Sequence, residues 1–225
     1  MTQISPTKKV LKRFCRNKLA IIGLFILSFF VLTAVFAPLL TNQDPNRANL
    51  RARNLPPSKQ HPFGTDDMGR DIYARTLYGG RISLSVGLVS VGISLSIGLV
   101  LGALAGFFGG VVDTCIMRLA DVFYSFPFLM LAITISAIFG PSIYNTMIIL
   151  GVLSWPSSAR LLRAEFLKLK NTDFVTAATA IGSSPARLMF RHILPNAFSP
   201  LLVSATLGVA SAILSEAGLS FLGLG

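Results

Sequence analysis

The stretch ISLSVGLVSVGISLSIGLVLGALAGFFGGVV at residues 82–112 decides the class of fold, because its 31 residues lie between Arg81 and Asp113 without a single charge. The hydrocarbon core of a bilayer is about 30 Å thick, and roughly 20 apolar residues cross it as a helix. The stretch is therefore long enough for one membrane-spanning helix, which we place at residues 83–108.

The composition of the whole chain agrees with a lipid environment. Of its 225 residues, 52% are hydrophobic and 13% are charged, which is about half the charged share of a typical soluble domain. A disordered chain needs the reverse balance and is excluded. The net charge of +11 would suggest nucleic acid as a partner of a soluble protein. Here the charges occupy short segments between apolar runs, so membrane topology explains them and no nucleic-acid partner is expected.

The apolar run between Asp121 and Arg160 holds 38 residues. As one helix it would be about 57 Å long, far thicker than the hydrocarbon, so it must fold back. The Gly-Pro pair within residues 139–142 supplies the turn. The fold class is therefore an all-α polytopic transmembrane bundle. Its five predicted spans are residues 19–40, 83–108, 119–138, 146–163 and 197–218. The first run is too long for the apolar core of a signal peptide, which is the alternative interpretation.

Lysine and arginine orient these spans, since cytosolic segments carry the excess of basic residues. With the N-terminus inside, the cytosolic side of the apolar runs holds 13 basic residues and the external side holds 7. The predicted cytosolic segments are 1–18, 109–118 and 164–195, and the predicted external segments are 41–82, 139–145 and 219–225.

Two spans carry small residues at every fourth position, which places them on one stripe of a helix. The stripes are Ser94, Gly98, Gly102 and Gly106 in the second span, and Ser204, Gly208 and Ala212 in the last. Small residues let helix backbones approach closely in lipid, so we expect packing faces. A pore lining is the alternative.

Ionisable residues within the spans are few. Arg118 and Asp121 are three residues apart and are expected to pair on one helix face. Glu216 lies near the outer end of the last span, where both a functional intramembrane acid and an interfacial position remain open. Pro127 and Pro156 are expected to kink their spans.

Motifs for catalysis are missing from the sequence. It contains no GxxxxGK[ST], HExxH or GxSxG pattern and no Cys/His metal set. We therefore expect no catalytic residue, no metal site and no enzymatic activity. Any energy from nucleotide must come from another chain.

A polar motif precedes the second span. It consists of Gly64, Thr65, Asp66, Gly69, Arg70, Asp71, Arg75 and Arg81. The clustered aspartates suggest a calcium loop, but the spacing of an EF-hand is absent. Acids interleaved with arginines predict a structural network of ion pairs and helix caps where the chain enters the membrane.

The segment 160–195 is long for a connection between two membrane helices. It predicts a short helix at 174–181 that Gly182 ends, followed by a helix that Pro195 stops. Its small side chains would be exposed to water, which a partner surface explains. They are Ala177, Ala178 and Ala180. A helix lying on the membrane surface is the alternative.

Three motifs together resemble those of ABC importer permeases. FVTAATAIG at 174–182 and HILPN at 192–196 look like the EAA…G…LP loop of that family. The polar motif, continued by Ser83-Leu84, resembles the signature of the C-type subunit of the oligopeptide/dipeptide/nickel subfamily. LSFLGLG at 219–225 is similar to a motif of the same subfamily.

The resemblance implies a type I ABC importer permease of the bacterial plasma membrane, forming half of a pore for di- and oligopeptides or nickel. The implied partners are a second permease subunit in a heterodimer, two cytosolic ATP-binding subunits and an extracellular or periplasmic solute-binding protein. ATP and Mg²⁺ would bind to the partner subunits, and this chain would bind no cofactor. The implied ATPase-coupling residues are Phe174, Thr176, Ala177, Ala178, Gly182, His192, Leu194 and Pro195.

Two departures from the family pattern are visible. Thr176 stands where the family has Glu, so docking is expected to rest on shape and apolar contact more than on charge. The family type has a sixth span beyond the LSFLGLG motif, before which this chain stops at Gly225.

Other functions are weighed against this one. A self-sufficient secondary transporter or channel would need acids at the membrane midplane, and these are absent. A membrane scaffold would not need the Ala-Ala-Gly loop. Within the ABC family, glutathione and other small solutes are alternative substrates.

Overall fold

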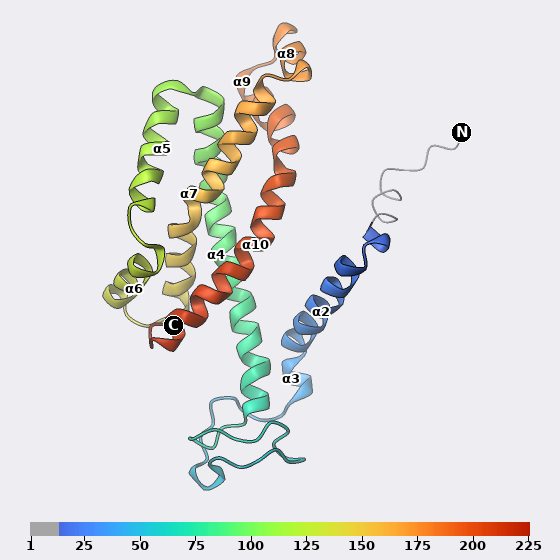
Figure 1. Ribbon diagram of the computed structural model, residues 1–225, viewed down its shortest axis with the longest axis vertical. Helices are drawn as coiled ribbons and strands as arrows, with labels where there is room; N and C mark the ends of the chain where they lie inside the picture. The colour runs from blue at the N-terminus through green and yellow to red at the C-terminus, as the bar shows by residue number, and fades with distance from the viewer. Residues whose placement is uncertain (1–13) are drawn as a thin grey trace, which may run out of the picture. The chain divides into compact units, whose positions relative to one another are not determined.

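Helices make up most of residues 14–225, the part of the chain that the computed structural model describes (Figure 1). In chain order they are α2 (Lys18–Val35), α3 (Ala37–Leu40), the 3-10 helix η1 (Leu50–Ala52), α4 (Ile72–Phe108), α5 (Gly110–Tyr124), α6 (Phe128–Phe139), α7 (Ile143–Lys170), α8 (Asp173–Ala180), α9 (Pro185–Arg187), the π-helix η2 (Leu188–Ile193) and α10 (Leu194–Phe221). These residues contain no β-strand, so the all-α class is confirmed. The predicted N-terminal segment 1–18 lies mostly outside the described residues.

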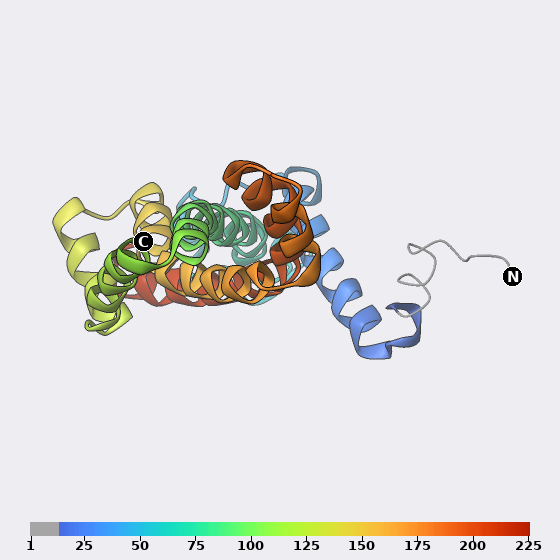
Figure 2. The same cartoon turned by 90° about the horizontal axis from the view of Figure 1, so that it is seen from above.

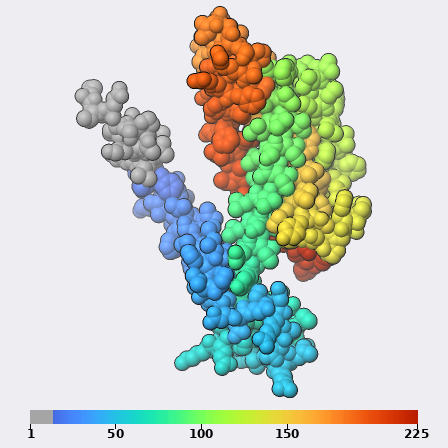
Figure 3. Space-filling view, turned by 180° about the vertical axis from the view of Figure 1, so that it is seen from behind, coloured from blue at the N-terminus to red at the C-terminus, as the bar shows by residue number. Residues whose placement is uncertain are grey.

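The chain divides into two units, residues 1–82 and 83–225. The first holds α2, α3 and the loop that leads into α4. In the space-filling view the atoms of this loop form a compact cluster (Figure 3). In the second unit α7 contacts α5, α6, α8 and α10 (Figure 2). Eleven of its residues are buried. α7 is therefore the central helix of the second unit.

Within residues 14–225, three helical stretches are long and apolar enough to cross a membrane, namely Lys18–Val35, Ile72–Phe108 and Pro185–Phe221. A fourth is possible if the bent pair α5 and α6 counts as one span. α7 is not among them, although the sequence places a span at 146–163. Because α7 packs against protein on several sides, it can carry small and polar residues that a lipid-facing helix would avoid. The five-span topology stays a prediction.

The segments before and after the predicted second span differ from expectation. α4 begins at Ile72 and not at residue 83, because the Asp71 carboxylate accepts the Ala74 N–H at 2.7 Å and caps the helix. The predicted turn at 109–118 is mostly helical. Gly109 and Gly110 alone make the reversal, with φ values of 67° and 54° that glycine adopts freely.

The predicted third span is broken. Its segment 119–138 divides into the end of α5 and most of α6, and the two helix axes differ by 83°. The break ends at Pro127, which confirms the expected kink there. By contrast, α7 continues through Pro156 as one helix. The turn at Gly140 lies where the sequence predicts it, with a φ of 83°.

Pro195 does not stop a helix, which corrects the prediction for this residue. Helical structure continues from Pro185 to Phe221. The reason lies in η2, where the Leu194 N–H bonds to the Met189 carbonyl five residues back. This wider turn precedes Pro195, which takes a first-turn position of α10, where a missing N–H removes no helix bond.

Candidate functional site

The short helix α8 ends in a complete Schellman motif. The Ser183 N–H bonds to the Ala178 carbonyl at 3.1 Å, and the Gly182 N–H bonds to the Thr179 carbonyl at 2.9 Å. Gly182 has a φ of 82°, a conformation that a residue with a Cβ rarely adopts. Hydrogen bonds of the backbone thus fix the direction in which the chain leaves α8.

One face of α8 is buried in the second unit. Val175 and Ala178 are 3% and 6% exposed and pack in a cluster with Leu162 and Phe166 of α7. Ala178 therefore anchors the helix, which corrects its expected place on an exposed alanine face. The prediction failed because alanine is equally common on both faces of a helix, and only the contact with α7 distinguishes them.

The opposite side of α8 is uncovered. Ala177 and Ala180 are exposed there, and Phe174 and Ile181 flank them with 43% and 85% of their surface exposed. Thr176 is exposed as well, and its hydroxyl donates to the Thr172 carbonyl at 3.2 Å. This side carries small and large apolar side chains with no charge at position 176, and the exposed Asp173 lies four residues before Ala177 on the same face.

The following segment is anchored in the same way. Leu188, Met189 and Ile193 of η2 are buried in the cluster that holds α8. His192 and Leu194 are partly exposed and Pro195 is exposed. The residues from 172 to 195 therefore form a projection that is packed against α7 and α10, and not a flexible linker.

The small stripe of α4 lies against α7. A Cβ built on Gly98 would be 2.5 Å from the Ser158 Cβ, and one on Gly102 would be 2.5 Å from the Ala159 carbonyl oxygen. Gly106 meets Phe166 in the same way. Ser94 continues the stripe, and its hydroxyl lies 3.1 Å from that of Ser158. The two backbones are as close as glycine allows.

Two ion pairs join α5 to α7. Arg163 forms a bidentate pair with Asp113, of which the Nη2–Oδ2 distance is 2.5 Å. Arg160 Nη2 lies 2.5 Å from Asp121 Oδ1. Arg118 also pairs with Asp121, as expected, but at 3.7 Å. Sequence spacing shows only pairs within one helix, so both links to α7 were missed.

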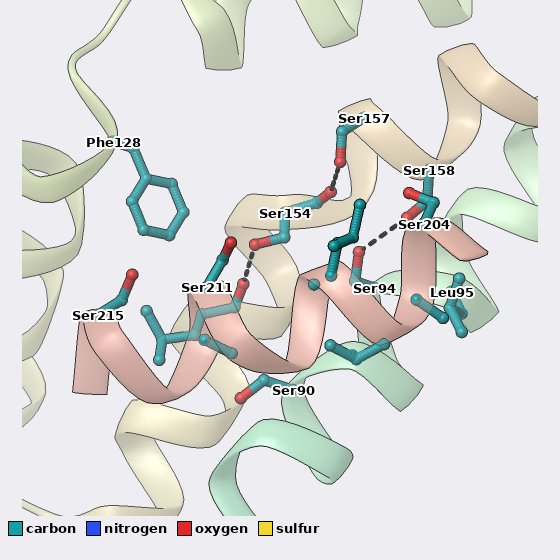
Figure 4. Close-up of a pocket in the computed structure, with 16 residues that line it drawn as sticks. Ser90, Ser94, Leu95, Phe128, Ser154, Ser157, Ser158, Ser204, Ser211 and Ser215 are labelled. Carbon is teal, nitrogen blue, oxygen red and sulfur yellow. Dashed lines mark hydrogen bonds between the residues drawn. The ribbon is translucent and has the colours of Figure 1, made fainter. Parts of the chain in front are cut away.

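A cavity of about 410 Å³ lies between α4, α7 and α10 of the second unit (Figure 4). Its lining has no charged side chain and is rich in hydroxyls. The lining serines are Ser90 and Ser94 of α4, Ser154, Ser157 and Ser158 of α7, and Ser204, Ser211 and Ser215 of α10. Phe128 of α6 closes one end (Figure 4). The sequence shows the stripe of α10, but the convergence of three helices on one space is visible only in the structure.

Glu216 is buried near the end of α10, with 6% of its surface exposed. Its carboxylate accepts hydrogen bonds from Ser83 at 3.2 Å and Ser220 at 2.7 Å. Glu216 is therefore held inside the protein, and the choice between an intramembrane and an interfacial position stays a prediction.

The polar motif of the first unit builds the loop before α4. Asp71 is 4% exposed, and besides capping α4 it pairs with His61 Nδ1 at 2.8 Å. The Thr65 hydroxyl donates to the Ala52 carbonyl and accepts the Leu55 N–H. These contacts close the loop on itself.

Asp66 holds the tip of the same motif. Its carboxylate accepts the N–H groups of Met68 and Arg70 and pairs with the Arg70 and Arg75 side chains at 2.7 and 3.8 Å. Desolvation alone would raise the pKa of Asp66, but these hydrogen bonds and the Arg70 charge lower it below its usual value.

Two glycines of the motif are required by close approach and backbone conformation. Gly64 and Gly69 have φ values of 77° and 72°, and a Cβ would collide with the Leu55 carbonyl at the first and the Asn49 carbonyl at the second. Arg81 lies on α4. Within residues 14–225 no group of three or more acidic, His or Cys residues could hold a metal ion.

Apolar helices of membrane-spanning length define an integral membrane protein, and its uncharged cavity combines serine hydroxyls with apolar side chains. The comparisons with known proteins give the family. Residues 98–225 match the binding-protein-dependent transport system inner membrane component, and residues 5–57 match the N-terminal TM domain of oligopeptide transport permease C. The chain belongs to this family of permeases. It is the membrane-spanning subunit of an ABC importer, a transport component and not an enzyme, and ATP hydrolysis belongs to a separate subunit.

Several curated relatives cover the whole chain. The dipeptide transport system permease protein DppC of Alkalihalophilus pseudofirmus is 45% identical over 100% of this chain and 74% of its own length. The oligopeptide transport system permease protein OppC of Bacillus subtilis is 41% identical over 99% of this chain and 73% of its own length.

A solved structure supports the fold independently. A chain of the MetNI methionine ABC transporter, in an inward-facing conformation, matches with a TM-score of 0.57 at 22% identity, over 64% of this chain and 72% of that chain. The type I ABC importer permease fold predicted from the sequence is thereby confirmed.

Proposed function

We propose that this chain forms half of a heterodimeric peptide-conducting pore in the bacterial plasma membrane, with its N-terminus and residues 164–195 in the cytosol. A second permease subunit, two ATP-binding subunits and a solute-binding protein complete the importer. ATP and Mg²⁺ bind to the ATPase subunits. The observation that carries the coupling role is the projection at 172–195, which is anchored on α7 and uncovered on its outer side.

A rigid projection can transmit a movement. Because Val175 and Ala178 are buried against α7, a push on α8 moves α7 as well. The small side chains of Ala177 and Ala180 let a groove of an ATPase subunit approach closely, and Phe174 offers an exposed apolar contact. We therefore expect docking to depend little on salt.

The lining of the cavity favours peptide over a free nickel ion as the substrate. Nickel is held by imidazole, thiolate or other nitrogen and oxygen donors. The cavity has no His, Cys, Asp or Glu side chain, whereas its hydroxyls suit the amide groups of a peptide. The names of the relatives DppC and OppC agree with this choice.

The docking role can be tested with substitutions on the two sides of α8. Ala177→Asp places a charge on the uncovered side and is expected to abolish copurification of the ATPase subunits and uptake, with permease yield unchanged. Thr179→Asp, which also alters an exposed residue but points well away from Ala177, is the matched control. Full uptake and copurification by the Ala177→Asp protein would refute the role. Ala178→Asp is unsuitable, because a buried charge would unfold the helix.

Gly182→Val tests the rigidity of the projection. The φ of 82° is strained for a β-branched residue, so the Schellman motif should open and α8 should lose its direction. We expect uptake to fall while the permease remains in the membrane. Unchanged uptake would show that the direction of α8 is unimportant.

The topology has its own test. A cysteine at Ser183 should react with an impermeant thiol reagent in inverted vesicles and not in intact cells. Cys15 and Cys115 are both free and exposed, so they are first replaced by alanine. Labelling of the Ser183→Cys protein in intact cells would contradict the orientation.

A further inference from the structure

We propose that a row of hydroxyls on α10, formed by Ser204, Ser211 and Ser215, is the surface of this chain along which the backbone of a transported peptide passes. The inference rests on the proposed function and deepens it by assigning the pathway to particular side chains. All three residues line the cavity between α4, α7 and α10 (Figure 4).

The hydroxyls of the row have no partner in the described part of the chain. This distinguishes them from most other serines of the cavity. The Ser90 hydroxyl donates to the Met147 carbonyl at 3.0 Å, and that of Ser154 donates to the Leu150 carbonyl at 2.7 Å. A serine in a lipid-facing helix normally bonds back to its own helix, as Ser154 does, because lipid offers no partner. Unpaired hydroxyls are instead suited to a passing polar molecule.

A hydroxyl on the opposite side of α10, which faces outward, bonds to the backbone of its own helix. Thr206 is exposed, and its hydroxyl donates to the Val203 carbonyl at 2.8 Å. Its apolar neighbour Val203 is 62% exposed. The two sides of α10 therefore differ. The outward side is apolar, and its Thr206 hydroxyl bonds to the helix's own backbone, whereas the cavity side carries a stripe of unpaired hydroxyls.

The row is extended and not a single spot. Ser204, Ser211 and Ser215 are spaced by seven and four residues, so they share one stripe of the helix. At 1.5 Å per residue the row is about 16 Å long, more than half the hydrocarbon thickness. An extended peptide advances about 3.3 Å per residue, so roughly five residues would lie along it.

The chemistry of the row fits a peptide backbone of any sequence. A peptide entering a membrane loses water from its N–H and C=O groups, which costs free energy unless they find new partners. A hydroxyl both donates and accepts, so it can pair with either group. Because the cavity lining has no charge, it neither attracts nor repels charged side chains of the peptide.

Cysteine accessibility tests the position of the row. In the importer with Cys15 and Cys115 replaced by alanine, Ser211→Cys should react with a small water-soluble thiol reagent during turnover, and a dipeptide should slow the reaction. Thr206→Cys on the same helix is the matched control and should not react. If Ser211→Cys reacts only with lipid-soluble reagents, or with none, the row faces lipid or another helix and the inference is overturned.

Uptake tests the chemistry. Replacing all three serines by alanine should lower dipeptide uptake about tenfold, since each neutral hydrogen bond contributes only a few-fold. Thr206→Val should leave uptake unchanged. Ser211→Asp should discriminate against an acidic dipeptide relative to a basic one, and Ser211→Lys should do the reverse, whereas the unmodified protein is expected to take up both alike.

These outcomes separate the inference from the function beneath it. If the unmodified complex takes up dipeptides and the triple alanine protein does so at the same rate, the inference is wrong and the proposed function stands. If the assembled, ATP-hydrolysing complex takes up no peptide at all, the proposed function fails, and the inference fails with it.

Discussion

The small stripes of α4 and α10 are alike in sequence and differ in the structure. Both place small residues at every fourth position of an apolar helix, serine and glycine on α4 and serine, glycine and alanine on α10. The stripe of α4 is tightly packed against α7, since a Cβ on Gly98 or Gly102 would lie 2.5 Å from an atom of that helix. On α10 the contact is looser, since a Cβ on Gly208 would approach no atom more closely than 3.3 Å, at the Val91 side chain. A small-residue stripe thus permits close packing but does not require it.

The largest effect is expected from Gly102→Leu. The new side chain would collide with the Ala159 backbone and Leu162, so α4 and α7 must separate. We expect loss of folded, assembled permease, because such overpacking costs about 3 kcal/mol or more where backbones cannot move. The measurement is the yield of monodisperse protein in detergent. Gly92→Leu on the same helix is the control, since a Cβ there meets nothing within 4 Å. Equal yields would mean that the α4 stripe is not packed.

A smaller change compares the two stripes directly. Gly98→Ala is expected to lower the free energy of unfolding by about 1–3 kcal/mol through collision with Ser158. Gly208→Ala should be neutral, or stabilising by up to about 1 kcal/mol, because alanine is the better helix former and the Val91 side chain can yield. Thermal unfolding in detergent measures both. Equal destabilisation by the two substitutions would remove the difference between the stripes.

The smallest effect concerns the hydroxyls. Ser94→Ala removes a buried partner of Ser158 and should cost about 1 kcal/mol of stability. Ser211→Ala removes a hydroxyl without a partner, so stability should change by less than about 0.5 kcal/mol. The same unfolding assay applies, with uptake measured in parallel. A stability loss for Ser211→Ala as large as that for Ser94→Ala would show that Ser211 has a structural partner.

The loop at 172–195 shows where prediction from sequence reached its limit. Gly182 and the short helix before it follow from local chemistry, because a positive φ after an alanine-rich helix needs glycine. The burial of Ala178 does not follow, because nothing in the local sequence says which side of the helix meets α7. Pro195 misled for a similar reason. A proline normally limits a helix, and only the π-turn before it lets the helix continue.

The sequence by itself determined that this chain is an α-helical membrane protein. Uncharged runs of membrane-spanning length and the Gly-Pro turn within residues 139–142 are local features, so they can be recognised in order along the chain. The three motifs were specific enough to indicate the permease family. Only the tertiary structure decided which small stripe is packed and which lines a cavity, that Arg160 and Arg163 pair with α5, and that Glu216 is buried. These features depend on residues far apart in the sequence, and which of several similar faces meet is decided by packing of the whole bundle.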